Sequence, residues 1–264
     1  ESFNLELQTG GIPVVVKIIH EIQDGRRSML SRYRELTVGA AGWGYLVRYE
    51  LCMLLFRNLP GALGLFLRKT FFPGLFGACG RGVLFGTGLT LRNPRAIRLG
   101  ARVVIDENVV LDAKGMAAGG LSVGDDVFLS RNVLLVGKGG EIQIGARCSL
   151  GPNTIVHSLG AGRIAIGACS AIAANCYLIA GGTYRSERTD VPMIDQGQVP
   201  EKGIEIGEDV WLAVGTVVPD GARIGRGTII GAQSLVRGEI PDYSVAFGIP
   251  ATVRRSRRPG AASE

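Results

Sequence analysis

Side chains that could act as a general base are scarce in this chain, which contains only two histidines, His20 and His157. A histidine is largely neutral near pH 7 and can accept a proton from a hydroxyl group. His20 lies in the stretch VVVKIIHEIQDG, where we expect a surface or packing residue. His157 directly follows an aliphatic residue in a regular region, so we expect its side chain to face outward. We predict that His157 is the general base, the alternative being a substrate-binding or simply exposed histidine.

A second group of polar side chains lies in the stretch LIAGGTYRSERTD at 178–190. Thr183, Tyr184 and Arg185 follow two glycines there and open a long irregular segment. Phenol and alcohol hydroxyls titrate near pH 10 or above, so neither hydroxyl residue is a ready base at neutral pH. We predict a supporting catalytic role for Tyr184 and substrate contacts for Thr183 and Arg185.

A six-residue repeat must position these side chains. From residue 99 onward, aliphatic residues recur every six positions in groups of three. The groups are Leu99, Ile105, Leu111; Val123, Leu129, Leu135; Ile144, Leu150, Val156; Ile166, Ile172, Leu178; Ile206, Leu212, Val218; and Ile224, Ile230, Val236. A period of six matches neither a helix nor a long strand, but it fits a short strand followed by a turn. Three such units predict a triangular coil of about 18 residues, and coils stacked about 4.8 Å apart would enclose the aliphatic residues.

Two further features follow the repeat. We expect an irregular coil before the first regular one, formed by Phe85, Leu91 and Ile97. Asparagine tolerates a left-handed backbone and can bond to the next coil, so asparagines at equivalent positions predict a structural ladder along one corner. Such asparagines stand three residues after the middle aliphatic residue in four successive coils: Asn108, Asn132, Asn153 and Asn175.

With these motifs, residues 81–255 resemble the hexapeptide-repeat family, whose fold is a left-handed parallel β-helix. The DVW at 209–211 and the GIPATVRR at 248–255 resemble the C-terminal part of acetyltransferases that act on sugars and xenobiotics, including galactoside and maltose acetyltransferases. The resemblance implies a homotrimer that binds acetyl-CoA or another acyl-CoA in the groove between neighbouring prisms, with a histidine as base and no metal. The γ-class carbonic anhydrases share the fold but need three histidine ligands, which two histidines cannot supply.

The resemblance also implies roles for single residues. It places the pantetheine arm of the acyl donor near four residues: Trp211, Ala213, Gly215 and Ala232. Arg255 matches a family arginine near the nucleotide, and Arg237 would supply a positive charge where relatives carry a Thr-Lys pair. Asn153 matches an asparagine near the acceptor, although the ladder is the stronger explanation for it. The family histidine at the start of the excursion is replaced by Thr183 in this chain.

Composition limits the class of protein. The 264 residues are 46% hydrophobic and 20% charged, so a disordered chain is not the default expectation. The net charge of +6 includes the segment VRRSRR at 253–258, which is either a solvated tail or a site for phosphates or anionic lipid. The sequence has no basic stripe with interleaved aromatic residues, so we do not expect it to bind nucleic acid. Five cysteines without metal-ligand spacing favour reduced thiols in a cytoplasmic protein.

We predict three segments. Residues 1–80 form a mainly helical extension, residues 81–242 form the β-helix with an excursion at 183–203, and residues 243–264 form a C-terminal segment with a basic tail. Charged residues and prolines interrupt the apolar stretch 42–77, so no run is long enough to span a bilayer. Its helices either pack over the end of the prism or against a partner subunit, or lie at the inner membrane surface as a peripheral contact.

The leading functional hypothesis is an acyl-CoA-dependent O-acyltransferase that acetylates a sugar hydroxyl of a surface glycan or of its lipid-linked precursor. The sugar class follows from the resemblance and from no single residue. Two alternatives stay open. One is a trimeric scaffold that has lost the catalytic base, and the other is an acyltransferase whose donor is an acyl carrier protein.

Overall fold

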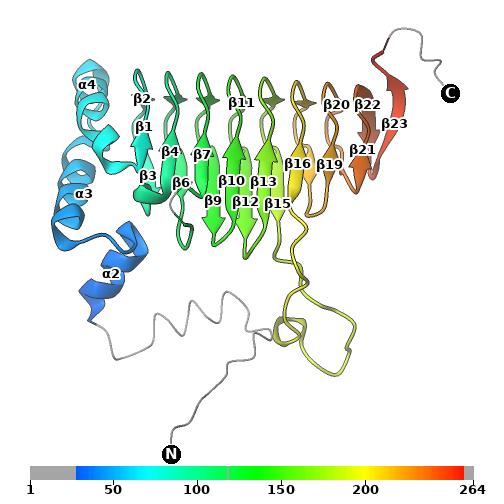
Figure 1. Cartoon of the computed structure of the whole chain (residues 1–264), viewed down its shortest axis with the longest axis horizontal. Helices are drawn as coiled ribbons and strands as arrows, with labels where there is room; N and C mark the ends of the chain where they lie inside the picture. The colour runs from blue at the N-terminus through cyan, green and yellow to red at the C-terminus, as the bar shows by residue number, and fades with distance from the viewer. Residues whose placement is uncertain (1–27, 118, 259–264) are drawn as a thin grey trace, which may run out of the picture.

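The computed structural model describes residues 28–117 and 119–258, and its fold is mainly β, as predicted. Its strands form three parallel sheets that are the sides of a prism, with helices at one end and an antiparallel strand at the other (Figure 1). From β1 to β17, each strand pairs with the strand three places further along the chain, one full coil later. This arrangement is a parallel β-solenoid, consistent with the predicted left-handed β-helix.

The three sheets are numbered here by the order in which a coil meets them. Sheet 1 contains β1 (Ala78–Cys79), β4 (Ile97–Leu99), β7 (Leu121–Val123), β10 (Glu141–Ile144), β13 (Arg163–Ile166), β16 (Ile204–Ile206), β19 (Arg223–Ile224) and β21 (Glu239–Ile240). Sheet 2 contains β2 (Leu84–Phe85), β5 (Val104–Ile105), β8 (Phe128–Leu129), β11 (Ser149–Leu150), β14 (Ala171–Ile172), β17 (Trp211–Leu212), β20 (Ile229–Ile230), β22 (Ser244–Gly248) and β23 (Ala251–Ser256). Sheet 3 contains β3 (Thr90–Arg92), β6 (Val110–Asp112), β9 (Leu134–Lys138), β12 (Ile155–Leu159), β15 (Tyr177–Ala180) and β18 (Val217–Val218).

The interior of the prism is formed by the six-residue repeat. All eighteen repeat aliphatics named from the sequence are buried. The predicted irregular coil is present, because Phe85, Leu91 and Ile97 are buried on sheets 2, 3 and 1 in turn, and Cys79 of sheet 1 comes before them. Cys79 pairs with Leu99, whereas Ile97 pairs with Leu121 and so opens the second coil. Both Ile97 and Leu99 are buried on β4, so this strand ends the irregular coil and also begins the first regular one.

The predicted asparagine ladder is present at the corner between sheets 2 and 3. All four asparagines have φ between 56° and 59°. The side-chain amide of Asn132 donates to Asn153 Oδ1 at 3.0 Å, and that of Asn153 donates to Asn175 Oδ1 at 3.2 Å. The ladder therefore lets the chain turn with a left-handed residue in each coil and joins successive coils at the surface.

Irregular loops gather at a single edge, the corner between sheets 3 and 1. The other two corners keep the six-residue spacing throughout. Only the step from Ile206 to Ile224 has the eighteen residues of a regular coil, and each earlier step is longer. The extra residues form the 3₁₀ helix η2 (Pro94–Ala96) and loops at 113–117, 119–120, 139–140, 160–162 and 181–203. The last loop is the predicted excursion, and Figure 1 shows it leaving the prism between β15 and β16.

Three helices close the N-terminal end of the prism: α2 (Met29–Val38), α3 (Trp43–Phe56) and α4 (Gly61–Phe71), followed by the 3₁₀ helix η1 (Phe72–Leu75). The hydroxyl of Ser28 caps α2 by accepting from Ser31 N at 3.2 Å. Helix α3 buries Leu46, Tyr49 and Cys52 against the first coil. Within the described ranges, no helix is both long and apolar enough to cross a bilayer.

The helices also satisfy the open hydrogen-bonding edge of the first coil. The buried Arg68 donates through Nε to Phe85 O at 2.8 Å, and Tyr49 donates to Leu91 O at 2.8 Å. Gly88 is bonded on both sides by Arg57, whose carbonyl accepts from Gly88 N at 3.1 Å and whose Nη2 donates to Gly88 O at 3.2 Å. An unpaired strand edge invites association with other chains, so this helical cap protects the end of the solenoid.

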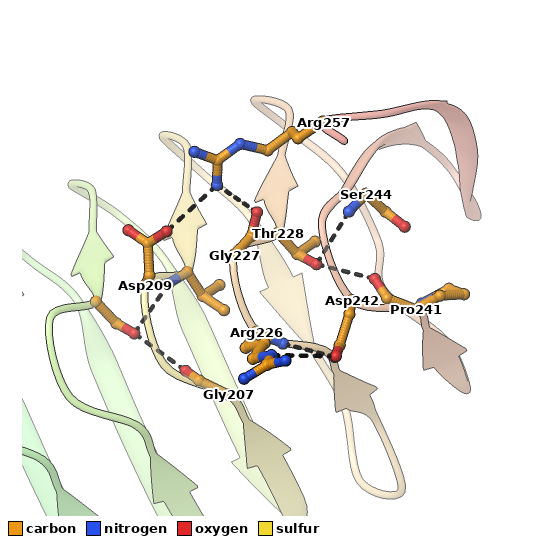
Figure 2. A network of polar contacts seen from close by, with 11 residues as sticks. Gly207, Asp209, Arg226, Gly227, Thr228, Pro241, Asp242, Ser244 and Arg257 are labelled. Carbon is orange, nitrogen blue, oxygen red and sulfur yellow. Dashed lines mark hydrogen bonds and ion pairs between the residues drawn. The ribbon is translucent and has the colours of Figure 1, made fainter. Parts of the chain in front are cut away.

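The C-terminal end is closed by β23, which folds back antiparallel on β22. Figure 2 shows how Arg257, just after β23, reaches the corner between sheets 1 and 2. Its guanidinium donates to Gly227 O and lies 3.5 Å from Asp209 Oδ2. Arg226 and Asp242 form a second ion pair at 3.4 Å in the same network. These contacts fasten the C-terminal segment to the last coils.

Candidate functional site

His157 lies on the outer face of sheet 3, as expected for a residue that follows an inward aliphatic. It belongs to β12, where the register places it between Val136 of β9 and Ile179 of β15. These aliphatic neighbours leave the imidazole half-buried. Asp112 stands two coils away in the same row, and its carboxylate is engaged instead by Lys114 N at 3.0 Å and by Arg92 Nε at 3.6 Å. His20 lies outside the described residues.

The surroundings of His157 favour the neutral imidazole. Burial is the larger cause and the positive charge of Lys138 the smaller one, and together they lower the pKa of His157 from its ordinary value of 6.5, with Asp112 opposing. The imidazole is therefore unprotonated at neutral pH, which is the state that a general base needs. Its Nε2 is enclosed and has no hydrogen-bond partner among the described residues. A hydroxyl group would reach the ring through Nδ1, or through Nε2 after rotation of the ring about χ2.

The start of the excursion lies at the same edge of the prism as His157. A Cβ on Gly182 would lie 2.6 Å from Leu159 Cδ1, so the chain packs closely onto the residue two places after His157. Thr183 O accepts from Val199 N at 2.8 Å, and Arg185 N donates to Gly197 O at 3.0 Å, which ties the two strands of the excursion together at its base. Tyr184 is half-buried between them, whereas Thr183 and Arg185 are exposed.

The residues assigned to the pantetheine arm lie elsewhere, on sheet 2 and at the corner between sheets 2 and 3. Trp211 is 51% exposed on the outer face of β17, in line with Ala171 and Ile229. Ala213 and Ala232 lie at the following corner, where the side chains are small over several coils. Gly215 continues the asparagine position with φ 72°, and a Cβ there would lie 2.4 Å from Gln233 Nε2. The corner therefore exposes backbone along a narrow strip.

The remaining predicted residues are separated from this strip. Arg237 is exposed after the last inward residue of sheet 3, and Arg255 is exposed on β23 opposite Val245. Asn153 uses its side-chain amide in the ladder on both sides, as the sequence suggested. The predicted functional roles of all three residues stay predictions.

The structure thus sorts the predicted site residues into two groups on different faces of one prism. His157 and the Thr183–Arg185 segment lie on sheet 3 and at its far corner, whereas Trp211 and Gly215 lie on sheet 2 and at the near corner. One chain does not bring the candidate base to the candidate donor strip. A site that contains both groups requires a second copy whose sheet 3 faces this strip.

Sequence reasoning missed two residues that shape the surroundings of His157. Lys138 lies in β9, pairs with Leu159, and contributes to lowering the pKa of His157. Leu159 supports the start of the excursion. The extra residues at 139–140 and 160–162, which directly follow Lys138 and Leu159, could have indicated both, because insertions at one corner of a regular solenoid mark a surface built for function.

Among the described residues, no three histidine, cysteine, aspartate or glutamate side chains are grouped closely enough to hold a metal ion.

Comparison with known proteins supports the hexapeptide repeat and shows similarity to proteins named acetyltransferases. Residues 203–238 match the family model described as bacterial transferase hexapeptide (six repeats), which confirms the resemblance to hexapeptide-repeat proteins. The chain is 32% identical over 168 residues to the probable acetyltransferase Rv3034c of Mycobacterium tuberculosis, covering 64% of this chain and 54% of that protein. It is 28% identical over 168 residues to the putative lipopolysaccharide biosynthesis O-acetyl transferase WbbJ of Escherichia coli, covering 62% of this chain and 73% of that protein.

Two other similarities are shorter or more distant. The chain is 48% identical over 60 residues to a galactoside O-acetyltransferase of Lactococcus lactis, covering 23% of this chain and 29% of that protein. The chain thus spans about half or less of the first two relatives it matches. Its fold is similar to that of AntD, an N-acyltransferase from Bacillus cereus solved with dTDP and 3-hydroxybutyryl-CoA, with a TM-score of 0.50 and 18% identity over 72% of this chain and 88% of that one.

Proposed function

We propose that this chain is an acyl-CoA-dependent O-acyltransferase that transfers an acetyl group to a sugar hydroxyl of a surface glycan or of its lipid-linked precursor. The observation that carries the proposal is the similarity of the solenoid to proteins named acetyltransferases, one of them connected by name with lipopolysaccharide biosynthesis. The neutral state of His157 is compatible with the base that such a transfer requires. We place the activity in the cytoplasm.

In the proposed reaction the acceptor hydroxyl attacks the thioester carbonyl directly. His157 takes the proton of the hydroxyl as the oxygen–carbon bond forms. The carbonyl oxygen becomes an oxyanion, which a backbone N–H of the corner strip would stabilise. The carbon–sulfur bond then breaks, and the leaving thiolate takes the proton back from the imidazolium. Trp211, Ala213, Gly215 and Ala232 would hold the pantetheine arm, while Arg237 and Arg255 would face the phosphates of the donor.

We further propose that the active form is a homotrimer in which each site is shared between two copies. The outer row of sheet 3 supports this arrangement, because it is apolar over successive coils and half-buried in the single chain. Its members are Val110, Leu134, Ile155, Tyr177 and Val217. A neighbouring prism docked along this row would bring its own corner strip beside His157.

The activity is tested by acceptor-dependent release of thiol from acetyl-CoA with candidate sugars. We expect the substitution His157→Ala to lower kcat/KM by about 10²–10⁴-fold, the usual contribution of a general base. The matched control is Ser122→Ala, which removes an outward hydroxyl on sheet 1, away from both groups. Unchanged turnover in His157→Ala would remove the base assignment and direct attention to Tyr184.

The shared site is tested by mixing two inactive variants. If each site takes His157 from one copy and the donor strip from the next, a randomly assorted equimolar mixture of His157→Ala and Ala213→Glu should recover about a quarter of the wild-type activity. No recovery, with mixed trimers confirmed by mass spectrometry, would contradict a site between copies.

Two alternatives have specific support. The enclosed Nε2 of His157 and the missing histidine after Gly182 favour a scaffold without catalytic activity. Calorimetric titration with acetyl-CoA separates this alternative, because a scaffold would not bind the donor. The basic segment 253–258 favours an acyl carrier protein as donor. A higher kcat/KM with acyl carrier protein than with acyl-CoA would establish that donor.

A further inference from the structure

The helical cap exposes a continuous apolar surface on the side that faces away from the prism. On α3, an exposed row lies opposite the buried row of Leu46, Tyr49 and Cys52, as expected at roughly 3.6 residues per turn. Helix α4 exposes a second set of large apolar side chains. This surface, the lipid-facing stripe, consists of Trp43, Val47, Leu51, Leu54, Leu55, Leu63, Leu65, Phe66 and Phe71.

The stripe is larger than the scattered apolar residues of an ordinary surface. Leu54 is 80% exposed and Phe66 is 64% exposed, and each belongs to a different helix. Stacking of Phe56 on Phe71 at 4.9 Å joins the two helices at their ends. A groove lined by Val47, Leu51, Leu55 and Phe71, among others, opens on the same surface. Exposed apolar patches of this kind mark sites of interaction with proteins or membranes.

The charges around the stripe indicate an anionic partner. Glu50 is the only acidic residue between Trp43 and Phe71, and it is half-buried and accepts a hydrogen bond from Tyr33 Oη at 2.6 Å. Arg48 and Lys69 are exposed on the two helices. A second copy packed on the stripe about a two-fold axis would bring these like charges together, which disfavours self-association. Anionic lipid headgroups would pair with them while the apolar side chains enter the acyl region.

We propose that the lipid-facing stripe lies on an anionic membrane surface and holds the prism upright on it. Because the helices close one end of the solenoid, the coils then stack away from the bilayer (Figure 1). His157 lies in the fourth strand of sheet 3, about 14 Å above the first at ~4.8 Å per coil. With a helix layer of about 10 Å beneath, the candidate base stands roughly 25 Å above the lipid.

This height selects a class of acceptor, an inference that rests on the proposed acyltransferase function. A sugar attached directly to a lipid phosphate would stay near the headgroups, below the site. An oligosaccharide carried on a lipid anchor can extend to the level of His157. The acceptor is therefore a lipid-linked chain of several sugars that is modified at a residue far from its anchor.

Membrane binding is tested first, by co-sedimentation of the full chain with vesicles of phosphatidylcholine alone or mixed with phosphatidylglycerol. We expect tighter binding to the anionic vesicles. The double variant Leu54→Glu/Phe66→Glu should weaken binding about a hundredfold, because each buried side chain contributes about tenfold or more. Lys69→Glu should weaken binding to the anionic vesicles alone, by about tenfold.

The matched control is Met193→Glu/Ile194→Glu, which adds the same charge at two exposed apolar residues of the excursion and should bind as the wild type does. Because Leu54, Phe66 and Lys69 are exposed, thermal unfolding should show that all variants stay folded. The proposal is overturned if the wild type binds neither vesicle, or if the double variant binds as tightly as the wild type. It is also overturned if ultracentrifugation shows that the wild type self-associates through the stripe and that the double variant does not.

Acetyl transfer to a soluble oligosaccharide, measured on the same preparations, separates the two proposals. Lost vesicle binding with unchanged soluble transfer in the double variant supports the membrane surface. Vesicle binding without transfer to any acceptor rejects the acyltransferase and leaves the surface intact. Equal rates on vesicle-borne acceptors with one sugar and with several sugars would overturn the upright orientation.

Discussion

Arg68 offers the sharpest test of how the helices close the prism. Its guanidinium is buried and donates to three backbone carbonyls, Leu59 O at 2.6 Å, Phe85 O at 2.8 Å and Phe56 O at 3.1 Å. The substitution Arg68→Met keeps most of the apolar packing and removes all three donors. Phe85 O then faces the helices without this donor, and Phe56 O and Leu59 O each lose a hydrogen bond from Arg68.

The expected loss follows from these three contacts. A buried carbonyl left without a partner costs about 1–3 kcal/mol, while removing a buried charge returns part of that cost. We therefore expect Arg68→Met to lower the free energy of unfolding by about 3–5 kcal/mol. For a chain of this size each kcal/mol shifts Tm by about 2–4 °C, so Tm should fall by roughly 6–20 °C.

The assay is thermal unfolding followed by circular dichroism at a fixed protein concentration. Arg81→Met is the matched control, because Arg81 is exposed on the first coil and its loss should change stability by less than about 0.5 kcal/mol. Light scattering should show that Arg68→Met associates more readily, since the first coil has lost a bond at its edge. If both variants melt together within about 2 °C, the guanidinium does not hold the cap in place and the reasoning is refuted.

Three other predictions concern the site and the corners. Because the folded-state pKa of His157 lies below 6.5, the contribution of His157 to folding stability should be lost as the pH falls from about 6.5 toward that lowered pKa. Turnover that depends on His157 as base should fall as the pH passes through the same pKa. In a pH–rate profile, Lys138→Glu should move the acid limb to higher pH, and an unmoved limb would contradict the role of Lys138. Asn153→Ala should be less stable than Asn153→Gly by about 1 kcal/mol in urea unfolding, because only alanine resists the left-handed backbone; equal stability would count against a backbone role for the ladder. Arg257→Ala should speed proteolysis of the C-terminal strand, while Arg131→Ala at an exposed corner should not; equal cleavage of the two would show that Arg257 does not fasten the strand.

The interior of the prism was predictable because the same positions of every coil must carry the same kind of side chain. An inward residue must be apolar in each coil, so the repeat is visible as a period in the sequence. The asparagine ladder was predictable for a similar reason, since one backbone conformation recurs at one corner. At β4 both Ile97 and Leu99 point inward, and a period of six does not say which of them continues the row.

The outer surface follows no such rule. Arg68 occurs in an apolar helix, where an arginine suggests a surface charge, and its buried role depends on carbonyls up to seventeen residues away. The same limit applies to the site, because His157 and Trp211 lie in coils that the period describes equally well but on different faces. Whether such residues meet depends on a second prism, and periodicity within one chain carries no information about that neighbour.

Closed ends have a consequence for how such a molecule can change in size. The helices contact the first coil and β23 pairs with β22, so the two ends of the solenoid are closed by segments outside its regular coils. The regular stretch from Ile206 to Ile224 could be duplicated without disturbing either terminus, lengthening the body by about 4.8 Å per copy. The length of the solenoid can therefore change in whole coils, by evolution or by design, while the helical cap and the C-terminal strand stay the same.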